Sequence, residues 1–151
     1  MSIAGVLAIP LYVVVEAMAT PEKSDTLTHG IRVNAQAFFL PEQSDPTERK
    51  HFFGYTIVIA NESERAVQLQ TRHWVIIDGA GRREDVRGEG VVGQTPRILP
   101  GESFKYQSFT RLKTSWGTME GEYHMTAEDG EEFDVAIGRF YLAMPKAASV
   151  K

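Results

Sequence analysis

Residues 119–137 read MEGEYHMTAEDGEEFDVAI, and this stretch decides the fold. Apolar and polar residues alternate in period two over 119–127 and again over 133–137, which is the pattern of strands buried on one face. Asp129-Gly130 lies between the two segments, and this dipeptide favours a tight hairpin turn. The stretch therefore predicts two antiparallel neighbours in a sheet that is packed on one side.

The same period-two pattern extends over most of the chain, and no segment has the apolar stripe of a helix. Including the two segments above, strands are expected over 31–39, 51–61, 67–78, 82–87, 102–110, 119–127 and 133–141. This spacing predicts an all-β fold, an antiparallel β-sandwich of about seven strands of the immunoglobulin or fibronectin type III kind. Trp74, in a central apolar strand, is expected in its core.

A chain of 151 residues fits one domain, which we expect over 28–144 with a C-terminal tail over 145–151. Residues 1–27 are expected to form a flexible or strand-forming arm, with a polar linker over 20–25. The apolar run within 3–15 is too short to span a bilayer, so no membrane association is expected. A cleaved signal peptide and a start codon assigned too early are the other interpretations of this run.

Composition excludes several classes of function. The net charge of −4 argues against binding of duplex nucleic acid, and the absence of cysteine excludes disulfides, thiolate catalysis and cysteine-ligated metals. A cysteine-free chain fits a cytoplasmic protein. The four histidines lie in separate segments without a metal-binding spacing, and no serine lies in a nucleophile elbow. We expect no metal, no cofactor and no enzymatic activity.

A dinucleotide-binding pattern, GxGxxG, occupies Gly88–Gly93, but Pro96 and Pro100 follow where the pattern requires a helix. This context excludes a Rossmann site. The glycines either form a tight turn that needs positive φ or present backbone amides to an anion.

Arginines flank this loop, and guanidinium groups suit phosphate oxygens. The hypothetical site would bind phosphate, pyrophosphate or a dinucleoside polyphosphate through Gly88, Gly90, Gly93, Arg72, Arg87 and Arg97. The alternative is that the arginines only pair with neighbouring carboxylates on exposed hairpins. Trp116, in a Ser-Trp-Gly turn, is either a lid on the core or an anchor for a protein partner.

Four blocks of sequence together resemble the ApaG family: Thr71–Asp78, Val86–Gly93, Leu99–Phe104 and Gly117–Tyr123. The resemblance covers about residues 29–144. It implies a fibronectin type III-like sandwich without a bound metal or organic cofactor.

The resemblance also suggests a biological context. Bacterial members are often encoded near an rRNA adenine dimethyltransferase and a diadenosine tetraphosphate hydrolase, and they are linked to cobalt resistance and magnesium efflux. In eukaryotes the domain occurs in an F-box protein and in a polymerase delta-interacting protein. We therefore expect a non-enzymatic module that binds a protein partner.

Overall fold

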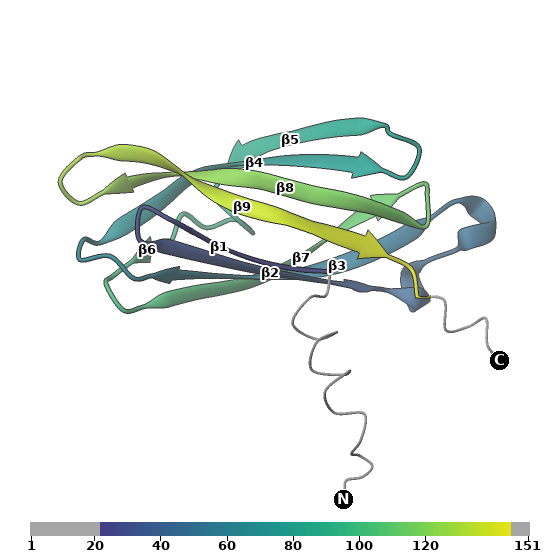
Figure 1. Cartoon of the computed structure of the whole chain (residues 1–151), viewed down its shortest axis with the longest axis horizontal. Helices are drawn as coiled ribbons and strands as arrows, with labels where there is room; N and C mark the ends of the chain where they lie inside the picture. The colour runs from purple at the N-terminus through teal and green to yellow at the C-terminus, as the bar shows by residue number, and fades with distance from the viewer. Residues whose placement is uncertain (1–21, 146–151) are drawn as a thin grey trace, which may run out of the picture.

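The computed structural model describes residues 22–145, which form two antiparallel sheets packed face to face (Figure 1). The four-stranded sheet contains, in order, β1 (Lys23–Thr28), β2 (Ile31–Phe39), β3 (His51–Asn61) and β7 (Ser103–Leu112). The five-stranded sheet contains β5 (Arg83–Glu89), β4 (Val67–Asp78), β8 (Trp116–Ala127) and β9 (Glu132–Ala143), with β6 (Arg97–Ile98) also paired to β4. Two 3-10 turns, η1 (Pro41–Gln43) and η2 (Pro46–Glu48), separate β2 from β3. The predicted all-β sandwich is confirmed.

Strand β6 was not expected from the sequence, and β1 lies where the sequence predicted the end of a flexible or strand-forming arm. Strand β1 is polar and lies at an edge, so it lacks the alternation that marks the other strands. It pairs along its whole length with β2, and the Ser24 hydroxyl donates to the Gly138 carbonyl of β9 at 2.7 Å. Part of the expected polar linker is therefore sheet, and the folded unit begins before residue 28; residues 1–21 and 146–151 lie outside the described part.

The core between the sheets is aromatic and aliphatic. Trp74 is 2% exposed, as predicted, and its indole makes edge contacts with the rings of Tyr55 and Phe140 at centroid distances of 5.4 and 5.9 Å. Such offset and edge contacts are favourable for buried rings. Within residues 22–145, no helix is long and apolar enough to cross a bilayer.

Two β-bulges change which side chains face this core. In β4, Leu69 is opposite Met125 and Thr71 is opposite His124, so Gln70 is an extra residue without a partner on β8. Beyond it, the inward positions are even-numbered and include Arg72 and Trp74. A bulge shifts the side-chain period in this way because successive strand residues point to opposite faces.

The second bulge lies in β9. Met119 pairs with Phe140 and Gly121 pairs with Ile137, so two residues of β9 are opposite Glu120 alone. As a result Phe140 is buried while Tyr141 is exposed.

Candidate functional site

The glycine-rich loop is a tight turn followed by extended chain and no helix. The Val91 amide donates to the Gln94 carbonyl at 2.8 Å, and the Gln94 amide donates back to Val91 at 2.9 Å. Between them, Val92 and Gly93 have φ of +42° and +79°. Positive φ at both central residues is the signature of a type I′ turn. The tight-turn interpretation is thus confirmed.

This turn is attached to the bulge of β4. The Gly90 amide donates to the carbonyl of the bulged Gln70 at 2.8 Å, and Val91, 1% exposed, inserts its side chain into the core. A Cβ atom at Gly90, which has φ of +62°, would collide with the Gln94 carbonyl oxygen. The amides of Gly90, Val91 and Gln94 therefore all donate to protein carbonyls.

The three arginines of the sequence-predicted anion site lie in different places. Arg72 contacts the loop, since its Nη1 donates to the carbonyls of Glu89 and Gly90 at 3.0 and 2.8 Å. Arg87 on β5 lies opposite His73 on β4 in the backbone ladder. Arg97 lies on β6 with its Nη2 3.9 Å from a carboxylate oxygen of Glu128. The structure places Arg72 beside the three glycines. Arg87 lines a hollow on the outer face that Arg72 and Gly88 also line, whereas Arg97 lies apart from both.

Gly88 lies opposite Arg72 in the ladder, and the absence of a side chain at this position has a steric reason. A Cβ atom at Gly88 would lie 2.9–3.1 Å from Nη1, Nη2 and Cζ of Arg72. The missing side chain lets the guanidinium group cross β5 and reach the loop.

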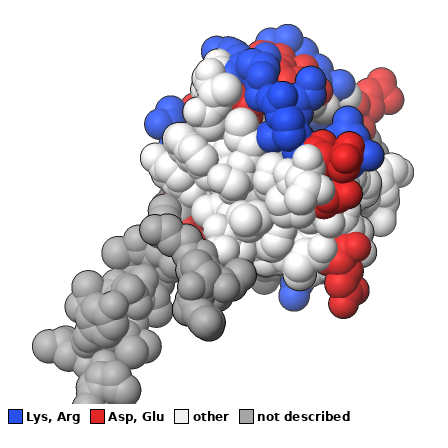
Figure 2. All heavy atoms as spheres, turned by 90° about the vertical axis from the view of Figure 1, so that its right-hand side faces the viewer, with Lys and Arg blue, Asp and Glu red and all other residues white. Residues whose placement is uncertain are grey.

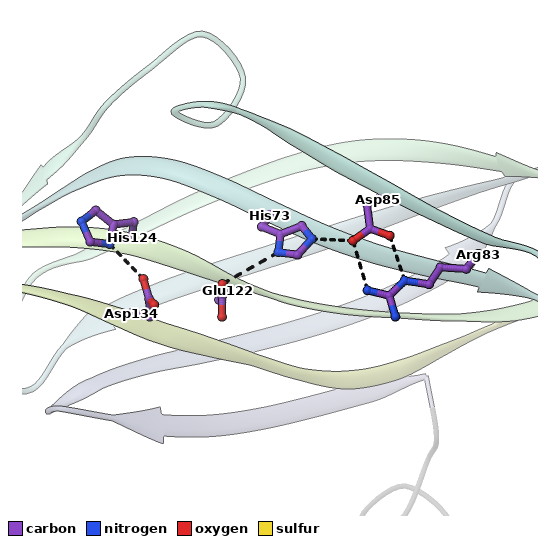
Figure 3. Close-up of polar contacts among 6 residues, drawn as sticks. All are labelled: His73, Arg83, Asp85, Glu122, His124 and Asp134. Carbon is purple, nitrogen blue, oxygen red and sulfur yellow. Dashed lines mark hydrogen bonds and ion pairs between the residues drawn. The ribbon is translucent and has the colours of Figure 1, made fainter.

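Histidines and carboxylates form an ion-pair network on the outer face of the five-stranded sheet (Figure 3). His73 Nε2 lies 2.8 Å from Asp85, whose other oxygen accepts from Arg83 Nε at 2.8 Å. Arg83 first and His73 second hold the pKa of Asp85 well below its usual range. The network therefore keeps this carboxylate ionised.

His124 lies between two carboxylates of β9. Its Nδ1 is 2.9 Å from Asp134 and its Nε2 is 2.8 Å from Glu132. Since a carboxylate only accepts hydrogen bonds, the imidazolium form of the ring, with both nitrogens donating, satisfies both contacts. Asp134, followed by Glu132, raises the pKa of His124.

His73 and His124 thus both contact carboxylates. Residues 71 and 124 are opposite in the ladder, as are 73 and 122, so the two rings belong to neighbouring strands of one face. Among residues 22–145, no group of three or more His, Asp or Glu side chains is arranged to hold a metal ion.

Trp116 is exposed at the end of the sandwich where the β4–β5 turn lies. Its side chain is 47% exposed and its ring stacks on Tyr141 at a centroid distance of 6.3 Å and an interplanar angle of 12°. Gly79 of the turn lies under the indole, because a Cβ there would be 2.5 Å from Nε1. Sequence reasoning identified Trp116 but missed Tyr141, since the bulge in β9 reverses the alternation that would have placed Tyr141 inside.

Comparison with known proteins gives consistent matches. The family model described as the ApaG domain matches residues 41–127. The "Protein ApaG" of Aromatoleum aromaticum is 49% identical over 123 residues, covering 82% of this chain and 97% of that protein. The "Protein ApaG" of Afipia carboxidovorans is 50% identical over 119 residues, covering 79% of this chain and 92% of that protein. A crystal structure of a Bordetella pertussis protein superposes with a TM-score of 0.76 at 44% identity, covering 80% of this chain and 98% of that one.

The loop geometry predicts different effects of alanine at two of its glycines. Gly93→Ala should lower the free energy of unfolding by about 1 kcal/mol, because its φ is left-handed but no atom lies within 4 Å of the new Cβ. Gly90→Ala should lower the free energy of unfolding by about 2–4 kcal/mol, because the new Cβ adds a collision with a backbone carbonyl to the strain at positive φ. Urea unfolding of both variants measures the difference, and equal losses would contradict this account of the loop.

The ion pairs of His124 predict a pH dependence. Because the folded state raises its pKa, His124 stabilises the fold below the ordinary histidine pKa, and this contribution is lost as pH rises through the raised value. NMR titration of the ring should give a midpoint above that of an ordinary histidine. The double variant Asp134→Asn, Glu132→Gln should return it to the ordinary range, and an unchanged midpoint would show that the carboxylates are not the cause.

Proposed function

This chain belongs to the ApaG family, and on that premise we propose that it is a cytoplasmic, non-enzymatic module that binds a protein partner through Trp116. The supporting observation is the exposed stack of Trp116 on Tyr141. Tryptophan and tyrosine are enriched among the residues that dominate binding energy at protein interfaces.

The backbone that carries Trp116 is hydrogen-bonded to the turn beneath its ring. The Thr114 hydroxyl accepts from the Gly79 amide and donates to the Trp116 carbonyl, at 2.8 and 2.7 Å, so the two turns under the indole are linked. Side chains that are already ordered lose little entropy on binding. Trp116 therefore has the properties of an anchor residue.

Charge at the same end of the sandwich indicates the character of the partner. A hollow beside the β4–β5 turn is lined by two acidic residues and four basic ones, Arg82, Arg83, Arg111 and Lys113. Figure 2 shows basic side chains gathered at the top of this end, above a wide uncharged area. Local positive charge on a chain of net charge −4 favours a partner with an acidic segment beside its apolar contact.

The family link to cobalt and magnesium fits this proposal without a metal site among residues 22–145. The histidines and carboxylates of the outer face already pair with one another. We propose that the link passes through a bound protein, such as a transporter or its regulator.

The test compares partner capture by the wild-type chain, Trp116→Ala and Phe109→Ala. Phe109 is a matched control, because it is 64% exposed on the other sheet. Quantitative mass spectrometry of captured proteins should show one or more partners lost with Trp116→Ala and kept with Phe109→Ala. Loss of an anchor typically costs about 2 kcal/mol or more, about a 30-fold change in affinity.

Two results would overturn the proposal. One is an identical set of captured proteins for all three chains. The other is equal binding of a captured partner at low and high salt, because contact with the basic residues should weaken as salt screens it.

A further inference from the structure

Arg72 places a positive charge between the two sheets. It shares the inner face of β4 with Trp74, and its neighbours across the sheet are Gly88 on β5 and Tyr123 on β8. Tyr123 is fully buried, so this row of the sheet combines a guanidinium group with core residues. An unpaired charge in such surroundings is costly.

No carboxylate among residues 22–145 lies within ion-pair distance of Arg72. By contrast, six other arginines of the described chain have such a partner: Arg32, Arg65, Arg82, Arg83, Arg97 and Arg139. The polar contacts of Arg72 in this part of the chain use Nη1 alone, donating to two backbone carbonyls. Nε and Nη2 thus remain able to donate to a ligand.

Arg72 lines a cavity of about 250 Å³ between β4 and β7. Its lining comes from both sheets and from the glycine loop: Tyr55, Arg72, Trp74, Glu89, Val91, Val92, Gly93, Tyr106 and Ser108. Val92, which is 52% exposed, lies at the rim, while Val91 and Trp74 provide apolar wall. The cavity is smaller than the roughly 300–1,000 Å³ of sites for drug-sized ligands, so its ligand is small.

The Ser108 hydroxyl donates to Tyr55, and the other hydroxyl groups in this cavity have protons to donate. The Tyr106 and Tyr123 hydroxyls are 2.5 Å apart, and Tyr123 makes no other side-chain hydrogen bond within the described chain. Since a buried proton needs an acceptor, Tyr123 donates to Tyr106, which leaves the Tyr106 proton free for the cavity. Burial also raises the pKa of Tyr55 and Tyr106, so these phenols stay neutral and do not balance the charge of Arg72.

We propose that this cavity binds a small monocarboxylate with an apolar body. A planar guanidinium fork matches a carboxylate, the hydroxyls of Tyr55 and Tyr106 supply further donors, and Ser108 orients that of Tyr55. Arg72 is the one cation on the lining and Glu89 is also there, which disfavours multiply charged anions such as pyrophosphate and dinucleoside polyphosphates. The apolar body lies against Trp74 and Val91. None of the lining residues belongs to the Trp116 surface, so this site and partner binding are independent.

The experiment is an amide NMR titration of the full chain at low salt with benzoate as the probe and benzamide as its neutral isostere. Benzoate should cause saturable shifts at the cavity residues, and benzamide should cause none. Pyrophosphate forms a third arm. If pyrophosphate binds at the same residues more tightly than benzoate, the ligand is not a monocarboxylate and the proposal is overturned.

Three variants test the residues. Arg72→Gln should abolish benzoate binding, but this change also loosens the loop. Ser108→Ala is therefore included as a milder variant. It should weaken benzoate binding about 5-fold, because it removes one hydrogen bond. Arg87→Gln, outside the cavity, should bind like the wild type. Equal shifts with benzoate and benzamide, no saturable shift, or binding unchanged in both Ser108→Ala and a folded Arg72→Gln would each refute the proposal.

Discussion

The hydrogen bond between the Gly90 amide and the Gln70 carbonyl is the contact on which the polar interior depends. Gln70 is the extra residue of a bulge, and the bulge reverses which side chains of β4 face the core. Without the bulge, the alternation that buries Leu69 would place Thr71 and His73 on the inner face. With it, Arg72 and Trp74 lie inside and the histidine lies outside.

The same bulge explains where sequence reasoning succeeded and where it could not. Period-two alternation predicted the strands, the hairpins and the buried Trp74, because these depend on local pattern and on turn residues. It could not predict a bulge, since an extra residue is visible only when the partner strand is known. The sequence therefore identified Arg72 as a candidate site residue but did not predict that its side chain faces inward. Tyr141 was missed beside Trp116 because of the second bulge.

Charges on the two faces of the five-stranded sheet are balanced differently. On the outer face, His73 and His124 lie beside carboxylates supplied by β5, β8 and β9, so that each charge has partners in reach of solvent. On the inner face, Arg72 donates to backbone carbonyls and shares its cavity with the phenols of Tyr55 and Tyr106 and with Glu89, whose carboxylate lies beyond ion-pair distance. An inner cation held by dipoles alone retains more of its attraction for an anion than a surface arginine in an ion pair, because less solvent screens it.

The GxGxxG pattern arises here from contacts that have nothing to do with a nucleotide. Gly88 leaves space for the Arg72 guanidinium, Gly90 leaves space for the Gln94 carbonyl, and Gly93 takes the left-handed position of a turn. Each requirement comes from packing or turn geometry within this sandwich, so the glycines would be needed even if no ligand bound. Their common effect is to hold two carbonyls against one nitrogen of Arg72, which fixes the guanidinium while leaving its other nitrogens at the cavity. The motif thus bears on ligand binding through the arginine it positions, and the chemistry of that arginine with its phenol neighbours indicates a carboxylate.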